Sequence, residues 1–191
     1  MGAQEIFDQA YQHYSKATGI LSEFGEMLEK ATKGNFTNEV ALTEFDCILQ
    51  YILLYEAIAD NKVSRLERQF IEKITDRGDI LVGVSKRVGR EITWASLEGM
   101  DSDEGMKVIS EMTPSYAEIL HDFCGSVAKA DGIIKDIDLF EMINESIVAI
   151  FASLAAIDGD VSDDEGAVVC NAYMDLFVEY YKKAVAEGEN L

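Results

Sequence analysis

Apolar residues recur along this chain at intervals of three and four positions, which is the period of an amphipathic α-helix. We expect about eight helices, with residues 99–106 counted as a loop or a short acidic helix. The other predicted helices cover residues 4–32, 38–59, 64–76, 78–97, 113–130, 135–157 and 162–187. The chain is therefore predicted to be all-α.

Local signals mark several of the predicted helix ends. Gly34 and Asn35 favour termination of the first helix, and Thr37 is a suitable N-cap for the second. The second helix carries apolar residues on more than one face, which indicates a central, buried position. Thr113 and Pro114 are typical of a helix start, because threonine caps helices and proline suits the first helical position.

Composition supports a helical fold in one domain. Pro114 is the single proline among 191 residues, whereas all-β folds, with their many tight turns, usually contain more. Gly83 and Gly89 fall inside a predicted helix, and we interpret them as sites of close packing against a neighbouring helix. We predict one domain over residues 1–191, a single compact bundle of about seven to eight helices, with residues 1–35 as an N-terminal helical extension.

The charge of the chain limits the classes of partner that it is expected to bind. Its formal net charge is −20, from 36 acidic and 16 basic residues. Such a surface repels nucleic-acid phosphates and anionic membranes, and it attracts metal cations or a basic partner. An alternative is that the acidity only keeps a cytoplasmic protein soluble. We expect a protein partner, no nucleic acid, and no direct insertion into a membrane; a homodimer is also open.

The N-terminal segment and the cysteines favour the cytoplasm. Residues 1–16 have neither a basic start nor an apolar run, so no signal peptide is visible. The longest uncharged apolar stretch, residues 146–157, is too short to span a bilayer. Cys47, Cys124 and Cys170 are odd in number and far apart in sequence, which argues against a disulfide framework or a zinc site. We interpret each as a buried free thiol.

One short pattern occurs three times, over residues 59–67, 130–138 and 157–165. Each copy has an aspartate, then glycine or asparagine, then a valine or isoleucine two positions later, and an acidic residue at its end. Asn61, Gly132 and Gly159 are expected to take the left-handed backbone conformation that ends a helix. Ser64 with Glu67, and likewise Ser162 with Glu165, have the spacing of a capping box.

The leading aspartates need a further explanation. They follow the C-terminal end of a helix, where the macrodipole disfavours negative charge by about 0.3–1 kcal/mol. Either a backbone N–H group of the turn or a bound cation would compensate. The third copy is the richest, since five carboxylates fall within eight residues: Asp158, Asp160, Asp163, Asp164 and Glu165. It is not an EF-hand, because Ser162, Asp163 and Val169 stand where that loop needs an acidic residue or asparagine, a glycine and a glutamate.

A helix that ends in Ala-Asp-Gly and is followed by a Ser-x-x-Glu helix start resembles the tellurite-resistance TerB-like family. The resemblance implies a compact all-helical domain with two pseudo-symmetric helix–acidic turn–helix units. It also implies a stress-response module, linked to tellurite resistance and phage defence, with an acidic metal-binding centre and no enzymatic activity. Asn61 in place of glycine, and Lys135 and Asp138 in place of serine and glutamate, depart from the pattern. With three copies present, the pair that would form the two units is open.

The residues that would hold a divalent cation, Ca²⁺ or Mg²⁺, are oxygen ligands in the three copies. The candidate metal ligands are Asp60, Glu67, Asp131, Asp138, Asp158, Asp160, Asp163 and Glu165. We expect no other cofactor.

Catalytic patterns are weak. The chain has no GxxxxGK[ST], HExxH or GxSxG motif. His121 and Cys124 share a helical face, but a partly buried histidine beside a small apolar residue is the favoured interpretation. Glu118 and His121 form one Glu-x-x-His pair, where a di-iron bundle needs two. We therefore predict no enzyme and no catalytic residues.

Two functions remain. The first is a TerB-like cytoplasmic module that binds a divalent cation through its acidic turns. The second is a metal-free helical interaction domain that docks a basic or membrane-bound partner. A basic zone in this acidic chain is a hint of an interaction face, and it comprises Arg65, Arg68, Lys73, Arg77, Lys86, Arg87 and Arg90.

Overall fold

The computed structural model of this chain describes residues 2–58, 63–75, 80–98, 102–134, 137–157, 159 and 177–188. Regular structure in these residues is helical throughout, which confirms the predicted all-α bundle. The helices of the described part are α1 (Ala3–Glu23), α2 (Gly25–Ala31), α3 (Asn38–Ile58), α4 (Arg65–Ile74), α5 (Ile80–Val88), α6 (Trp94–Glu98), α7 (Ser102–Asp131), α8 (Leu139–Ala156) and α10 (Glu179–Gly188).

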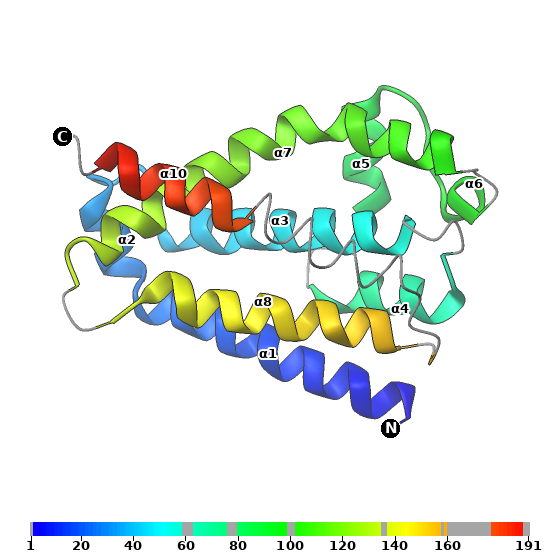
Figure 1. The fold of residues 1–191 in the computed structure, drawn as a ribbon, viewed down its shortest axis with the longest axis horizontal. Coiled ribbons are helices and arrows are strands. Elements are labelled where there is room, and N and C mark those ends of the chain that lie inside the picture. Colours follow the sequence, from blue (N-terminus) through cyan, green and yellow to red (C-terminus); the bar gives the residue numbers. More distant parts are fainter. Residues whose placement is uncertain are drawn as a thin grey trace.

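Helix α3 runs through the middle of the bundle, with α7 and α10 on one side and α1 and α8 on the other (Figure 1). Thirteen of its 21 residues are buried, which confirms the central position predicted from its apolar coverage. Thr37 accepts a hydrogen bond from the backbone N–H of Val40 at 3.3 Å and so caps the helix as expected. The three long helices α1, α7 and α8 can pack around α3 because each presents an apolar stripe to it.

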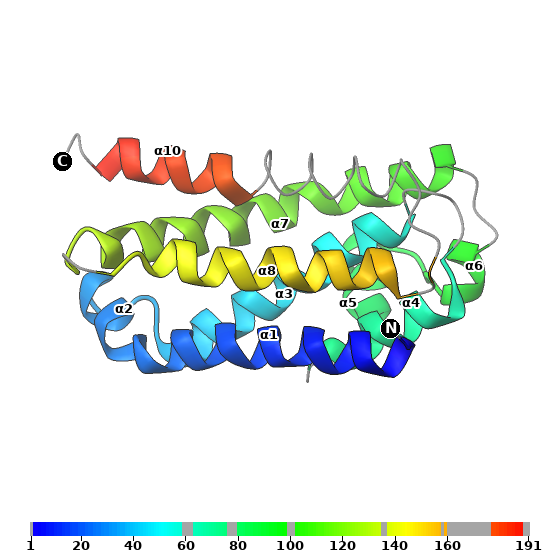
Figure 2. The same ribbon diagram turned by 60° about the horizontal axis from the view of Figure 1, so that its bottom comes forward.

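Helices α1 and α8 lie side by side along the length of the bundle (Figure 2). Ala10 and Ala17 of α1 are fully buried. Lys16 and Glu145 form an exposed ion pair between these helices at 3.2 Å, which adds little to stability. Residues at the N-terminus are thus part of the common core of the described bundle.

The helix predicted over residues 4–32 is divided at Phe24. The backbone there has φ −92° and ψ 5°, so the chain turns before α2 begins. A Cβ atom on Gly25 would lie 3.0 Å from the Cβ of Asn38, a tight contact that glycine avoids where α2 approaches the start of α3. The predicted end of the segment is confirmed, because Gly34 has a φ of 87°.

The single helix predicted over residues 78–97 is wrong: two helices, α5 and α6, occupy this stretch. Gly89 has a φ of 74° and ends α5. The Ser85 hydroxyl then accepts a hydrogen bond from the N–H of Ile92 at 2.8 Å and donates one to its carbonyl at 3.2 Å. No atom lies within 4 Å of the position of a Cβ on Gly89, so this glycine serves the backbone conformation and not close packing.

The helix start predicted at Thr113 and Pro114 is also wrong, because both residues lie inside α7. Proline inside a helix removes one backbone hydrogen bond and costs about 3 kcal/mol. Packing on α3 offsets that cost: Tyr51 stacks on Tyr116 with ring centroids 4.3 Å apart, and its hydroxyl lies 2.9 Å from that of Thr113. Asp103 and Glu104, two of the acidic residues before Met106, lie in the first turn of the same helix.

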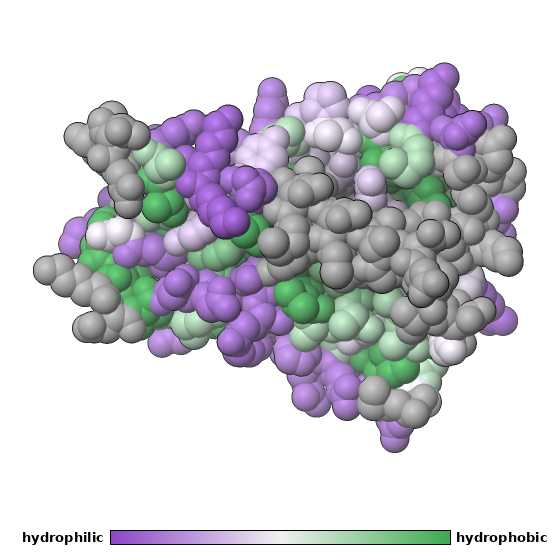
Figure 3. All heavy atoms as spheres, viewed as in Figure 1, coloured by the Kyte–Doolittle hydropathy of each residue, from purple (hydrophilic) through white to green (hydrophobic). Residues whose placement is uncertain are grey.

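Helix α8 starts at Leu139, four residues later than predicted. By length and composition it is, among the described helices, the one that could cross a membrane, although half of this stretch is buried inside the bundle. Such burial is also found in the core helix of a soluble protein. On the face shown in Figure 3, apolar residues reach the surface in patches between hydrophilic ones.

Candidate functional site

The second acidic turn joins three helices. Asp131 is the last residue of α7, and its carboxylate reaches the N-terminus of α8. Oδ1 accepts a hydrogen bond from the N–H of Leu139 at 2.7 Å. Oδ2 accepts one from the N–H of Phe140 at 3.2 Å and one from the hydroxyl of Tyr181, in α10, at 2.8 Å. Donors of the protein itself therefore occupy both oxygens of this carboxylate.

Asp138 completes the same helix end. It is the N-cap of α8, and its Oδ1 accepts a hydrogen bond from the N–H of Glu141 at 2.8 Å. A helix leaves four N–H groups at its start without partners inside the helix, and the two aspartates satisfy three of those in α8. Asp131 also lies at the positive end of the α8 dipole, which compensates for its place at the negative end of α7.

The surroundings of Asp131 change the pKa of its carboxyl group. Burial raises the pKa of this carboxyl above its usual value, and the three hydrogen-bond donors, which each lower it, do not fully offset that rise. Burial and the neighbouring carboxylate also raise the pKa of Tyr181. The Tyr181 ring stacks on Phe140 with centroids 3.7 Å apart, so the contact to α10 is held by both ends of the tyrosine.

The described part of the first turn shows the predicted capping box. Ser64 donates its backbone N–H to Glu67 Oε2 at 2.6 Å, and its Oγ accepts the N–H of Glu67 at 3.1 Å. Glu67 is buried, with 2% of its surface exposed. Figure 1 places α4 and the turn between α7 and α8 at opposite ends of the bundle, so Glu67 does not join Asp131 or Asp138.

The left-handed conformation predicted for the glycines of the turns is confirmed at one position and wrong at another. Gly159 has the expected left-handed backbone, with a φ of 83°. The prediction is wrong for Gly132, whose φ is not positive. Its N–H bonds to the carbonyl of Ala128 at 3.0 Å, so the helical hydrogen bonding of α7 continues one residue further. Asn61 lies outside the described residues.

Most candidate ligands of the first and third copies are not described. These residues are Asp60, Asp158, Asp160, Asp163 and Glu165. Among the residues that the structure describes, no group of three or more histidine, cysteine or acidic side chains is arranged to hold a metal ion. Asp131 and Asp138 are thus the pair of predicted ligands brought together at one helix end.

His121 and Cys124 do not form a reactive pair. The His121 ring is exposed, with Nδ1 3.3 Å from Oδ1 of Asp122. Cys124 is fully buried, and burial raises the pKa of its thiol to about 12. Its Sγ donates a weak hydrogen bond to the carbonyl of Phe177 at 3.8 Å. The thiol is therefore inert at neutral pH, as the interpretation of a buried cysteine expects.

The described part of the predicted basic zone is divided between α4, which carries Arg65, Arg68 and Lys73, and α5 with the turn after it, which carry Lys86, Arg87 and Arg90. Arg77 lies outside the described residues. Val82 is 68% exposed, and beside it on α5 Lys86, Arg87 and the following Arg90 are exposed. We define the α5 face as these four residues. A cleft of about 360 Å³ on one side of Val82 is lined by Cys47, Gln50, Ile80, Gly83, Arg87 and Tyr116. A cleft of about 540 Å³ on its other side is lined by Arg68, Leu81, Ser85, Glu91, Ile92, Thr93, Trp94 and Ala95.

Aromatic rings hold two of the arginines in place at these clefts. The guanidinium of Arg87 lies 4.8 Å from the centroid of the Tyr116 ring, and that of Arg68 lies 5.7 Å from the centroid of Trp94. Arg68 also pairs with Glu72 at 3.1 Å. Cation–π contacts of this kind fix a long side chain while leaving its charge accessible at the surface.

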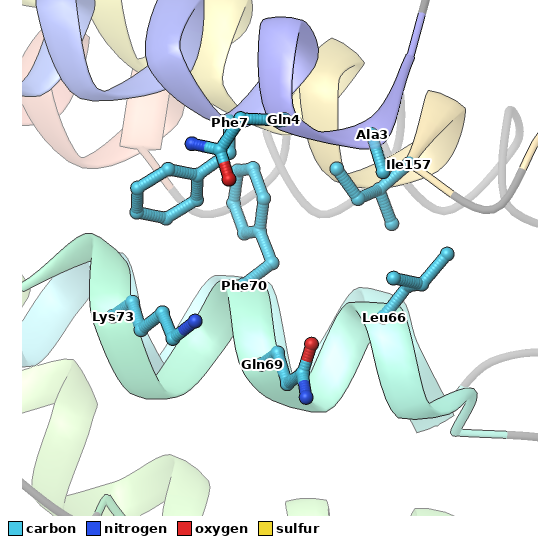
Figure 4. A pocket seen from close by; sticks show the side chains of 8 residues that line it. All are labelled: Ala3, Gln4, Phe7, Leu66, Gln69, Phe70, Lys73 and Ile157. Atoms are coloured by element: carbon cyan, nitrogen blue, oxygen red, sulfur yellow. The ribbon is translucent and has the colours of Figure 1, made fainter.

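A small pocket of about 130 Å³ opens between the start of α1, α4 and the residue after α8 (Figure 4). Phe7 and Phe70 meet there edge to face, with centroids 5.9 Å apart. Gln4, Gln69 and Lys73 lie around these rings and have no shared target in Figure 4. Such a narrow, partly apolar gap is a packing feature between helices.

Sequence reasoning missed a polar pocket of about 330 Å³ that we name the Glu44 pocket. It lies between the α2–α3 connection, α3 and α7, and it is lined by Thr32, Asn35, Phe36, Val40, Glu44, His121, Asp122, Gly125, Ser126 and Lys129. The signal for it is a carboxylate inside a helix predicted to be buried on several faces. Nothing in the sequence indicates which residues of α7 lie opposite.

Comparison with protein-family models, with curated proteins and with solved structures found no match to this chain.

Proposed function

We propose that this chain is a non-enzymatic helical module, TerB-like in its Asp-Gly turns, that docks a segment of a partner protein on the α5 face. The observation that carries the proposal is Val82, which is 68% exposed between two clefts. An exposed apolar side chain beside fixed arginines and an aromatic-lined cleft has the composition of an interface centre.

Charge indicates an acidic segment as the occupant. Seven of the 16 lysines and arginines lie between residues 65 and 90, against four acidic residues in the same range. At physiological salt the Debye length is about 8 Å, so the net charge of −20 elsewhere is largely screened at this face. A helix with an apolar residue flanked by carboxylates would place the apolar residue on Val82 and the carboxylates on Lys86 and Arg87.

The second acidic turn supports a structural use of the repeat. Asp131 takes three hydrogen bonds from the chain itself and so links α7, α8 and α10. A carboxylate has about four acceptor positions, so little of this one is left for a ligand. The turn acts as a joint between these three helices.

Photo-crosslinking tests the docking surface. Benzoylphenylalanine replaces Val82 in cells that make the chain, with Val148 of α8, which is 40% exposed, as the matched control position. We expect a discrete adduct at position 82 that is absent at 148 and is lost when Lys86→Glu and Arg87→Glu are added. Mass spectrometry should place the crosslink in an acidic, apolar segment of the partner. Adducts that are equal at both positions, or that map to a basic segment or to lipid, would contradict the proposal.

Binding of a divalent cation at the third acidic turn is the second candidate function. It is supported by the five carboxylates within residues 158–165. A ligand that binds only the native state raises the melting temperature. Chelator-treated protein is therefore unfolded thermally with Ca²⁺ or Mg²⁺, alongside Asp158→Asn. A rise at sub-millimolar metal that is lost in the variant would favour cation binding, and no shift with either metal would rule it out.

A further inference from the structure

The Glu44 pocket has walls whose polar groups are mostly engaged. The Thr32 hydroxyl donates to the carbonyl of Leu28 at 2.8 Å and accepts the N–H of Phe36 at 3.0 Å. The Ser126 hydroxyl donates to the carbonyl of Asp122 at 2.7 Å. These bonds are local to each element, so they fix the walls and do not close the space of about 330 Å³ between them.

Glu44 is not engaged in this way. Its Oε2 is buried and has no hydrogen-bond partner, although a buried carboxylate oxygen normally finds one. The side chain lines the pocket together with Asp122 of α7, whose carboxylate is mostly exposed. The pocket therefore offers one oxygen that needs a donor and a second carboxylate close enough to interact with the first.

Two carboxylates close together favour a positive charge between them. Burial, and next the negative charge of Asp122, raise the pKa of Glu44 to about 7. A cation bound between the two carboxylates would reverse the second effect and supply the missing donor.

The lining of the pocket suits a small organic cation better than a metal ion or a cation with two charges. The described residues show no group of three metal ligands here or elsewhere, and the volume is that of a small organic ligand. Phe36 and Val40 supply apolar walls. Lys129 lies two helical turns from Asp122 along α7, a rise of about 10 Å, and its ammonium opposes a second positive charge at that end.

We infer that the Glu44 pocket binds a small organic monoamine, whose ammonium donates hydrogen bonds to Glu44 and Asp122 while its apolar part contacts Phe36 and Val40. This binding site is separate from the α5 face, and it holds whether or not that face docks a partner. The inference is of binding alone.

The experiment is calorimetric titration of the full chain at pH 8 and 0.15 M NaCl with n-butylamine, 1,4-diaminobutane or butyrate. We expect saturable one-site binding of n-butylamine, binding of the diamine that is weaker by about tenfold because of Lys129, and no binding of butyrate. No binding of n-butylamine would overturn the inference, and tighter binding of the diamine would overturn the monoamine class.

Two pairs of variants separate the pocket from general attraction of cations to an acidic protein. Glu44→Gln should weaken n-butylamine binding by about tenfold or more, whereas Glu118→Gln, which removes one exposed charge from α7, should leave it unchanged. Equal losses in both variants would mean that only the net charge attracts the amine, and the inference would fail.

The second pair of variants tests whether the amine needs the space of the pocket, and neither variant removes a charged side chain. A Cβ atom on Gly125 would meet nothing within 4 Å, so Gly125→Leu extends into the pocket without a clash at its base. Gly19→Leu is the control, because this glycine also lies in a helix with open space around it. We expect only Gly125→Leu to abolish binding, with the circular dichroism of both variants unchanged. Retained binding in a folded Gly125→Leu protein would overturn the inference.

Discussion

Asp131 and Glu44 are both half-buried carboxylates whose pKa is raised chiefly by burial, yet their surroundings differ. Asp131 accepts three hydrogen bonds from α8 and α10. Glu44 has a buried oxygen without a partner and faces a pocket. The first carboxylate is satisfied by the fold itself, and the second is left for something that the fold does not contain.

The comparison separates structural from ligand-directed acidity in a chain with 36 acidic residues. Asp131 belongs to the repeated motif that resembles a metal-binding signature, but its contacts are those of a joint between helices. Glu44 belongs to no motif, and its contacts are those of a binding residue. Acidic residues are therefore better judged by the donors around them than by their density in sequence.

The largest effect is expected from Asp131→Ala. The substitution leaves two N–H groups at the start of α8 and the hydroxyl of Tyr181 without their acceptor. Hydrogen bonds to a charged group contribute about 1.5–3 kcal/mol each, but they are not additive at one carboxylate. We expect the free energy of unfolding to fall by about 3 kcal/mol, measured by urea denaturation monitored by circular dichroism. A fall below about 0.5 kcal/mol, the range of ordinary surface substitutions, would show that the turn is not a joint.

Glu44→Gln should change stability in the opposite direction. The pKa of Glu44 rises from 4.5 to about 7 on folding. The contribution of protonated Glu44 to the stability of the wild type is therefore fully present below pH 4.5 and is lost as the pH rises toward 7. Asp122, His121 and Lys129 face the same pocket and are the same in both proteins. With an allowance for solvent screening, we expect the variant to be more stable than the wild type by about 1 kcal/mol at pH 8.

The pH dependence of that difference is the sharper measurement. Urea denaturation of both proteins at pH 4, 6 and 8 should show a difference near zero at pH 4 that grows through pH 6. Glutamine resembles the protonated glutamate, so little separates the two proteins at low pH. A difference that is constant with pH would mean that Glu44 ionises normally in the folded protein.

The fold could be predicted further than the site, because its signals are local. The Ser64–Glu67 capping box and the left-handed Gly34 each depend on neighbours within a few residues. The prediction failed at Pro114, where packing of α7 on α3 outweighs the local preference for a helix start. It failed at Gly89 because a helix interior and a helix end look alike around one glycine.

The site could not be predicted from the sequence, because its contacts join residues that are far apart along the chain. Tyr181 is 50 residues from Asp131, and no periodicity predicts their hydrogen bond. The partners of Asp131 in α8 lie eight and nine residues on, beyond the reach of the turn patterns that were considered. The pocket at Glu44 depends on which residues of α7 pack opposite α3, and that is fixed only by the tertiary fold.

Tyr181→Phe tests one of the three bonds at the joint. The ring and its stacking on Phe140 remain, and only the hydroxyl that donates to Asp131 is removed. We expect a loss of about 1 kcal/mol in the free energy of unfolding, because the carboxylate keeps its two backbone donors. Tyr180→Phe, which lacks the bond to Asp131, is the matched control and should be close to neutral. If the two variants behave alike, α10 is not tied to the joint through this hydroxyl.

Asp138→Asn is expected to have the smallest effect and to decide between a cap and a cation ligand at the same helix end. Asparagine caps helices about as well as aspartate, so the bond to the N–H of Glu141 survives. Only the charge next to the α8 dipole is lost, which costs about 0.3–1 kcal/mol, and relief of the repulsion between the Asp138 and Asp131 carboxylates partly offsets this cost. We expect a change within about 0.5 kcal/mol in urea denaturation, and no difference in the effect of Ca²⁺ on the melting temperature. If Asp131 and Asp138 shared a cation, the loss of one charged ligand would instead remove a calcium-dependent rise that the wild type shows, and the joint would have to be interpreted as a metal site.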